Sequence, residues 1–164
     1  MTTDLRALID QYSAYDLWAN TLFVRRLDRE PDELLDRETP SSFPSLRATI
    51  LHMRNAEAAW LARITGAQQK WPASEETNIS DLLTHSVRMR DHVAGMNDAA
   101  MQRIIAYTDI KGNNHQQAAW QMLMHCFNHS TYHRGQLVTM MRSLGMEEIP
   151  HSDLVIYQRS LKQG

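Results

Sequence analysis

The stretch LMHCFNHSTYHRGQLVTMMRSLG, residues 123–145, carries most of the information about the fold. Its apolar residues recur at helical intervals, which predicts one long helix. We expect this helix to begin near His115 or Gln116 and to end at Leu144, because Gly145 supplies a C-terminal stop. Three histidines lie in the stretch at intervals of four residues. They either build a metal site or are polar residues on a buried helix.

The N-terminal part of the chain predicts a second long helix. It runs from about Asp4 to Leu27, with apolar and aromatic residues recurring every three or four positions. Thr2 or Thr3 is available as its N-terminal cap. This helix should be amphipathic and should pack one face against the rest of the protein.

Two more helices and one extended segment are predicted between these two. Ser45 can cap a helix that Gly66 would close, since glycine readily adopts the left-handed conformation that ends helices. A shorter helix is predicted from Ser80 to about Asn97, after a polar loop that contains a proline. The segment IIAYTDIKGNN, residues 104–114, favours a short hairpin or an extended connection, because it combines β-branched residues with a Lys-Gly-Asn turn.

Four long helices with modest connections predict an all-α four-helix bundle. The length of 164 residues fits one compact domain, and we expect residues 1–164 to form a single domain. Metal and cofactor sites are often built in the core of such a bundle. The fold by itself, however, says nothing about the chemistry.

The composition excludes several classes of function. A net charge of −2 and an isoelectric point near 6.4 do not favour nucleic-acid binding, which depends on concentrated Lys and Arg. No apolar run approaches the ~18 residues of a membrane span, and the N-terminal sequence lacks the apolar core of a signal peptide. The single cysteine, Cys126, rules out an internal disulfide. We therefore expect a cytoplasmic protein with no membrane partner.

The spacing of the last three helical histidines suits metal binding. On an α-helix, His129 and His133 lie ~40° apart around the axis with Cβ atoms ~6 Å apart, so both imidazoles can reach one ion. His125 extends the same stripe by one turn. Residues eight apart are separated by ~12 Å along the axis, so one ion would not take all three. The pair is either 125/129 or 129/133.

His52 is the best candidate for a third ligand from a facing helix. It shares its helical face with residues that look inward-facing, Thr49, Ala56, Ala59 and Trp60. A lone histidine is more often a satisfied core or surface residue than a ligand. The same applies to His85 and His92, which lie seven residues apart and are flanked by Met89 and Met96, interpreted as packing residues.

Four stretches of the sequence together resemble the DinB-like superfamily, which includes YfiT-like metal-dependent hydrolases and bacillithiol transferases. They are YDLWANTLFVRRL at 15–27, LHMRNAEAAW at 51–60, the histidine-bearing stretch at 123–145 and PHSDLVIYQR at 150–159. The element NHSTYHRGQ is the most specific of these motifs. The resemblance extends over nearly the whole chain.

The resemblance implies an up-down-down-up bundle, a homodimer and one divalent metal ion. The ligands fall on His52, His129 and His133, which leaves His125 as a non-ligand. A site with three histidines and an open position accepts zinc or nickel first, with iron, manganese or cobalt as alternatives.

The resemblance further implies a thiol S-transferase, in which the metal activates a low-molecular-weight thiol for attack on a small electrophilic substrate. A metal-dependent hydrolase is the first alternative, but it needs a base near the ion. Glu57 is off the face of His52 by ~140°, and Asp16 is as consistent with a surface charge as with such a base. A non-catalytic metal- or ligand-binding stress protein is the third hypothesis.

Several polar and aromatic residues are candidates for supporting roles around the histidines. Hydrogen bonds to the rings are expected from a set of four nearby residues, Asn55, Asn128, Tyr132 and Gln136. Tyr15 and Trp60 are the aromatic residues expected to line a substrate pocket. Cys126 is interpreted as a packing residue, and Gly135 as a position that allows a neighbouring helix to approach.

Overall fold

The computed structural model describes residues 4–67 and 71–162. Its elements are, in chain order, α1 (Leu5–Leu27), α2 (Asp32–Leu35), α3 (Leu46–Thr65), α4 (Asp81–Gly95), α5 (Asp98–Gln102), β1 (Ile104–Thr108), β2 (Asn114–Ala118), α6 (Ala119–Ser143) and α7 (Leu154–Ser160). The four long helices form the bundle that the periodicity predicts. The short helices α2, α5 and α7 are additions that the sequence pattern did not indicate.

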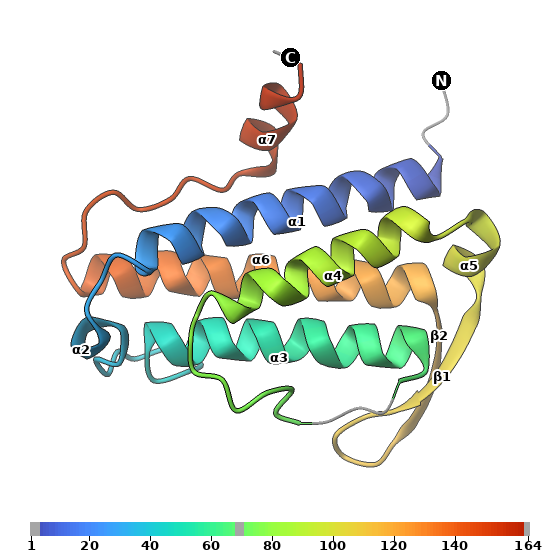
Figure 1. The fold of residues 1–164 in the computed structure, drawn as a ribbon, viewed down its shortest axis with the longest axis horizontal. Coiled ribbons are helices and arrows are strands. Elements are labelled where there is room, and N and C mark those ends of the chain that lie inside the picture. The colour runs from blue at the N-terminus through green and yellow to red at the C-terminus, as the bar shows by residue number, and fades with distance from the viewer. Residues whose placement is uncertain (1–3, 68–70, 163–164) are drawn as a thin grey trace.

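The bundle has the up-down-down-up arrangement. Helices α1 and α6 run in one direction, and α3 and α4 run in the other (Figure 1). Helix α1 packs against α4 and α6, and α3 packs against the same two helices, so α1 and α3 lie on opposite corners. The predicted fold class and arrangement are therefore confirmed.

Local sequence explains where the bundle helices begin and end. Asp4 caps α1 by accepting hydrogen bonds from the backbone amides of Arg6 and Ala7. Ser45 caps α3, and Gly66 ends it with a φ of 74°. The capping residues Thr2 and Thr3, proposed from sequence, lie outside the described residues.

The start of the last helix differs from the prediction. His115 and Gln116 belong to strand β2, which pairs antiparallel with β1 and places His115 opposite Tyr107. Pairing in the hairpin satisfies the backbone groups of this segment, so it has no need to join the helix. Helix α6 begins only at Ala119, where the side chain of Gln121 accepts a hydrogen bond from the amide of Ala118.

The third predicted helix also ends earlier than expected. Helix α4 ends at Gly95, and Asn97 caps the short helix α5 by accepting from the amide of Ala100. Asparagine favours such capping positions over a helix interior, which accounts for the difference.

The apolar core has two halves separated by a buried polar layer. One half lies toward the hairpin and includes Ile9 and Phe127, and the other lies toward α2 and includes Phe23 and Leu137. Between them along each long helix lie buried polar residues of the four helices, namely Asp16, Asn20, Glu57, Ser86, Ser130 and Arg134. None of the helices in the described ranges is long and apolar enough to span a membrane.

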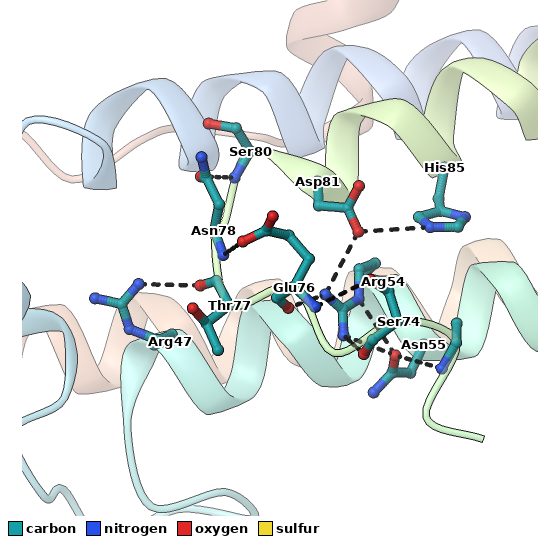
Figure 2. A network of polar contacts seen from close by, with 11 residues as sticks. Arg47, Arg54, Asn55, Ser74, Glu76, Thr77, Asn78, Ser80, Asp81 and His85 are labelled. Atoms are coloured by element: carbon teal, nitrogen blue, oxygen red, sulfur yellow. Dashed lines mark hydrogen bonds and ion pairs between the residues drawn. The ribbon is translucent and has the colours of Figure 1, made fainter.

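Two arginines hold the connection between α3 and α4 against the bundle (Figure 2). Arg54, which is almost fully buried, donates to the carbonyl oxygens of Ser74, at 3.0 Å, and Glu76. Arg47 donates to the carbonyl oxygen of Thr77 at 3.0 Å. These contacts fix the course of residues 71–80, which contain no helix or strand.

Asn55 belongs to the same anchor. Its Oδ1 accepts from Arg54 Nη2 at 3.0 Å and from the amide of Ala73 at 3.1 Å. We expected Asn55 to form a hydrogen bond with one of the candidate ligand histidines. Its Oδ1 holds the loop instead, so this expectation is wrong for that atom. The loop in turn carries Trp71, whose ring centroid lies 6.3 Å from that of His52.

Candidate metal centre

Three histidines from two antiparallel helices meet at one point. His52 Nε2 lies 3.0 Å from His129 Nε2, which lies 3.1 Å from His133 Nε2. One ligand nitrogen from each ring lies within 4.8 Å of the others. The spacing of four residues puts two rings on one face of α6, and the packing of α3 against α6 brings in the third. We call these three residues the histidine cluster.

The donor set fits a divalent metal ion. Tetrahedral sites with metal–nitrogen bonds of ~2.0–2.1 Å hold their nitrogens ~3.3 Å apart, close to the separations within the histidine cluster. Hydrogen bonds alone satisfy the cluster poorly, because His129 Nε2 faces two other ring nitrogens at once. His129 Nδ1 is buried and has no hydrogen-bond partner among the described residues. The three rings are therefore better placed to coordinate a metal ion than to form hydrogen bonds with one another.

The rings of the cluster are neutral at physiological pH. Burial and the neighbouring His133 lower the pKa of His52 from 6.5 to about 4. Burial and the other histidines lower the pKa of His129 to about 3. Burial also lowers the pKa of His133, against the raising effect of its bond to Gln136. Neutral imidazoles present lone pairs to an ion without first losing a proton.

Gln136 fixes the tautomer of one ring. His133 Nδ1 lies 2.8 Å from Gln136 Oε1, and Gln136 Nε2 donates to Ser42 Oγ at 2.6 Å. The oxygen can only accept, so Nδ1 carries the proton and the Nε2 lone pair of His133 faces the cluster. The prediction that Gln136 supports a ring is confirmed.

Aromatic side chains enclose the cluster. Phe43 stacks on His52 with ring centroids 4.1 Å apart and also contacts His133. The ring centroid of Tyr132 lies 5.0 Å from that of His133. Phe43 and Ser42 come from the linker before α3, a contribution that the sequence pattern did not reveal. No helical or metal-binding spacing marks them.

A groove of about 460 Å³ opens onto the cluster. His52 and His129 stand in its wall, while His133 is more deeply buried. Its other lining residues come from α3, α6, the hairpin and the loop after α3, chiefly Trp60, Arg63, Trp71, Tyr107 and His125. Trp60 was expected in a pocket, and the structure places it there. A ligand in this groove would therefore reach the open side of the cluster.

Comparison with known proteins agrees with this architecture. The model of the DinB family matches residues 1–161. The chain belongs to the DinB family. Protein DinB of Bacillus subtilis is 23% identical over 147 residues, which cover 83% of this chain and 86% of that protein. The resemblance seen in the sequence motifs is thus confirmed.

Two solved structures share the fold of this DinB family member. A DinB-like protein from Bacillus subtilis superposes with a TM-score of 0.68 at 15% identity, covering 87% of this chain and 97% of its own. One from Bacillus cereus gives a TM-score of 0.61 at 20% identity, covering 84% of this chain and 91% of its own. Identities this low support the fold alone.

The remaining histidines lie outside the cluster. His125 is one turn before His129 on α6, with ring centroids 6.0 Å apart, and packs its ring against Trp60. His85 lies 3.7 Å from Asp81 on α4. Met89 and Met96, between and beyond His85 and His92, are buried as expected of packing residues. In the described ranges, the cluster is the one group of three or more metal-ligating side chains with converging atoms.

Of the two alternatives for Asp16, the surface charge is wrong. Asp16 is 3% exposed and lies 2.6 Å from a guanidinium nitrogen of Arg134. Arg134 Nη1 also donates to Asn20 Oδ1 at 2.7 Å, and Asn20 Nδ2 donates to Glu57 Oε1 at 2.8 Å. Ser86 completes this set by donating to Glu57 Oε2 at 2.8 Å. We call these five residues the buried ion network.

A sequence signal for the network existed in the first helix. Asp16 and Asn20 lie four residues apart on the face that also carries buried Ala19 and Phe23. Two polar residues at helical spacing on an apolar face indicate an internal polar contact. The partners on α3, α4 and α6 could not be read from that spacing.

Three further expectations have clear outcomes. Cys126 is fully buried, and burial raises the pKa of its thiol well above the usual value, which supports a packing role. Tyr15 does not line the groove beside the cluster; it lines a separate cavity of about 1100 Å³, where it donates to the carbonyl oxygen of Ser152 at 2.7 Å. Gly135 does not serve close packing, because a Cβ there would meet no atom within 4 Å.

Proposed function

We propose that this DinB family member binds one divalent metal ion through His52, His129 and His133 and acts as a thiol S-transferase. The observation that carries the proposal is the convergence of three neutral imidazoles beside a groove that reaches two of them. Three protein ligands leave a coordination position open, which is typical of catalytic rather than structural sites. Zinc or nickel is our first expectation for the ion, followed by iron, manganese or cobalt.

The proposed reaction joins an external thiol to a small electrophile. A divalent ion acts as a Lewis acid, which lowers the pKa of a thiol or water that reaches it. In the transfer, a carbon–sulfur bond forms, the leaving group departs with the electron pair of the broken bond, and the thiol proton passes to solvent. The chain contributes a fixed set of imidazoles, a groove that orients the reactants and aromatic walls that exclude water.

The thiol does not come from the protein itself under this proposal. Cys126 is fully buried in the apolar core, and its thiol stays protonated because burial raises its pKa. A buried thiol of this kind is chemically inert. A low-molecular-weight thiol from outside is therefore required as co-substrate.

Hydrolysis has less support from the placement of carboxylates. Glu57 and Asp16 are enclosed in the buried ion network and do not line the groove. Asp109 does line it but is engaged within the hairpin, where it accepts from the amides of Lys111 and Asn113. In the described part of the chain, the groove thus offers no uncommitted carboxylate as a base for activating water.

Metal content tests the first half of the proposal. We expect about one ion per chain by elemental analysis of the purified protein, and loss of the ion from His52→Ala, His129→Ala and His133→Ala. His125→Ala is the matched control, because His125 lies on the same face of α6 outside the cluster and should retain the ion. Equal metal content in all four variants would show that the ligand assignment is wrong.

Thiol consumption tests the second half. Fully metallated protein should accelerate the loss of a thiol in the presence of a halogenated aromatic electrophile, and His129→Ala should not. If a panel of cellular thiols shows no metal-dependent loss while the ion is bound, a non-catalytic metal- or ligand-binding role replaces the transferase.

The homodimer expected from the resemblance stays a prediction. Leu8 on α1 and Val87 on α4 are exposed apolar residues on two helices that pack together. We propose this face as the dimer contact. Sedimentation of the wild type against a Leu8→Glu, Val87→Glu double variant tests it, with a monomeric double variant expected.

A further inference from the structure

His125 differs from the other charged, amide and imidazole side chains that line the groove outside the histidine cluster. The others are Arg63, Asp109, His115 and Gln117. His115 Nε2 lies 2.9 Å from Asp109 Oδ2, and the guanidinium of Arg63 lies over two aromatic rings. Gln117 Oε1 accepts from the hydroxyl of Tyr107 at 2.6 Å. Neither ring nitrogen of His125 has a hydrogen-bond partner among the described residues.

His125 stands beside the cluster in the same groove. It lies one turn before His129 on the same face of α6, and the two ring centroids are 6.0 Å apart. His125, His129 and His52 all line the groove. One helical turn rises by ~5.4 Å, a distance that a few bonded atoms span. When one atom of a ligand is held at the cluster, its neighbouring groups are therefore within reach of the His125 ring.

Packing limits the orientation of the His125 ring. Trp60 meets this ring edge-on, with centroids 4.8 Å apart and an angle of 61° between the two planes. Trp60 in turn packs edge-on against Tyr107, with centroids 5.5 Å apart. These contacts restrict the rotamers of His125, so less side-chain entropy is lost when the ring forms a hydrogen bond with a ligand.

The His125 ring is suited to donate a hydrogen bond to an oxygen atom. Neutral imidazole has one N–H group and protonated imidazole has two, so the ring donates in either state. Burial first, and the charge of Arg63 second, lower the pKa of His125, which favours the neutral ring. Much of the remaining lining is apolar, with Ala56, Ala59 and Trp71 among its residues. In a pocket of this kind, a few polar groups fix the orientation of the ligand.

We propose that His125 donates a hydrogen bond to a carbonyl oxygen of the electrophile, next to the carbon that the thiol attacks. This inference rests on the proposed function, since it assumes that a thiol and an electrophile react in the groove. It names the substrate class as carbonyl compounds with a leaving group on the adjacent carbon. The thiol sulfur forms a bond to that carbon, the leaving group departs with the electron pair of its bond, and the thiol proton passes to solvent.

Two effects on the electrophile follow from this hydrogen bond. It holds the reacting carbon between His125 and the cluster, where the thiol is expected. It also draws electron density toward the carbonyl oxygen, which makes the adjacent carbon more electrophilic. A compound of the same shape without the oxygen gains neither effect.

Binding to the metal-free protein tests the hydrogen bond without turnover. Acetophenone has the carbonyl oxygen but no leaving group, and ethylbenzene has nearly the same shape without the oxygen. With isotopically labelled histidine, we expect acetophenone at saturation to shift the ring-nitrogen resonances of His125 by more than ethylbenzene does. Comparison with His125→Gln assigns these resonances. Equal shifts with the two compounds would overturn the inference.

Thiol transfer by the metallated protein gives the second test. Phenacyl chloride and phenethyl chloride differ only in the carbonyl oxygen, and each is compared with its own uncatalysed reaction, using the most active thiol of the cellular panel. His125→Phe keeps a ring against Trp60 but has no donor. We expect this variant to lose about tenfold of the acceleration with phenacyl chloride, the effect of one hydrogen bond, and to lose none with phenethyl chloride.

Further variants separate hydrogen bonding from packing. His125→Asn and His125→Gln each keep an N–H donor, so at least one of them should be more active than His125→Phe with phenacyl chloride. His92→Phe is the matched control, because His92 lies on α4 and does not line the groove. It should match the wild type with both chlorides. If both amide variants are as weak as His125→Phe, the ring acts through packing and the inference is wrong.

The outcomes separate this inference from the proposed function. If no thiol is lost with either chloride while acetophenone shifts the His125 resonances, the proposed function is wrong and His125 remains a carbonyl-binding residue. If thiol is lost with both chlorides and His125→Phe affects the two equally, only the role of His125 is wrong. The comparison of acetophenone with ethylbenzene uses the wild type, so it stands even if His125→Phe fails to fold.

Discussion

The histidine cluster and the buried ion network are two polar groups inside one bundle, and they satisfy their atoms in different ways. The network combines unlike partners: a guanidinium, two carboxyl groups, an amide and a hydroxyl, from all four long helices. The cluster combines three copies of the same group, which compete for the same hydrogen-bonding role. Each of the five network residues has a partner of a different chemical type, although Arg134 Nε finds no hydrogen-bond partner among the described residues, whereas the three like rings of the cluster could together hold a metal ion.

The charges of the network nearly balance within the core. Arg134 pairs with Asp16, and Glu57 hydrogen-bonds the same aspartate. Burial first, and the charge of Asp16 second, raise the pKa of Glu57 well above its usual value. Burial also raises the pKa of Asp16, against the lowering effect of Arg134, so we expect the proton of this pair on Glu57 and the charge on Asp16 beside Arg134. A network built this way stabilises the fold in one arrangement.

The two groups also respond to pH in opposite directions. For His52, the unfolded chain binds a proton more readily than the folded one, so stability falls as pH drops from 6.5 toward about 4. For Glu57, the folded chain binds the proton more readily. The stabilisation of the folded state by protonated Glu57 is present at low pH. It is lost as the pH rises above 4.5 and through the raised pKa of Glu57 in the folded protein.

Removing the cation of the network should give the largest effect. Arg134→Met leaves Asp16 buried without its partner, so we expect a loss of about 3–5 kcal/mol in the free energy of unfolding. Urea denaturation measures it. Arg142→Met, an exposed arginine two turns later on α6, should change stability by less than about 0.5 kcal/mol. Similar losses in both variants would mean that the pair with Asp16 contributes little.

Metal binding at the histidine cluster should stabilise the folded protein, and this effect should not depend on the buried ion network. With zinc at about 100 times its dissociation constant, the wild type should gain about 2.7 kcal/mol in the free energy of unfolding. His129→Ala should gain nothing, and His125→Ala should gain as much as the wild type. Thermal unfolding with and without zinc checks this. A zinc effect that survives in His129→Ala would place the binding site elsewhere.

Loss of the ring support from Gln136 should weaken metal binding without removing it. Gln136→Ala frees the His133 ring to change tautomer and orientation, and such changes typically reduce metal affinity about 10–100-fold. Competition with a chromophoric chelator measures the affinity. Thr139→Ala is a neutral comparison on the exposed side of the same helix. Equal affinities of the two variants would show that the hydrogen bond from His133 has no role in binding.

The smallest effect concerns the proton on Glu57. Glu57→Gln keeps a donor toward Asp16 at every pH, so its stability relative to the wild type should rise as the pH increases above 4.5, by about 1 kcal/mol. In the metal-free protein, His52→Ala should change the pH dependence of the free energy of unfolding only at acidic pH. Urea titrations at several pH values measure both. Parallel profiles for Glu57→Gln and the wild type would indicate that Glu57 is ionised in the folded protein.

The sequence by itself determined the four long helices, a hairpin or extended connection before the last of them, and a pair of histidines on that last helix. Helical periodicity, Ser45 and Gly66 sufficed for α3, and the four-residue spacing placed His129 beside either His125 or His133 as a ligand pair. These features depend on neighbours within a few residues along the chain. The helical face of His52 made it the best candidate for a third ligand, and the resemblance to a family selected 129/133 over 125/129, because spacing along one helix does not show which turn faces another helix.

Only the tertiary structure decided which side chains meet across helices. It showed that Asp16 is buried against Arg134, that Asn55 holds a loop and that Phe43 covers the cluster. It also showed that Arg63 shares a groove with His52. Each of these contacts depends on how two helices or a helix and a loop are placed in space. Helical periodicity gives the face of a residue but not what lies opposite that face.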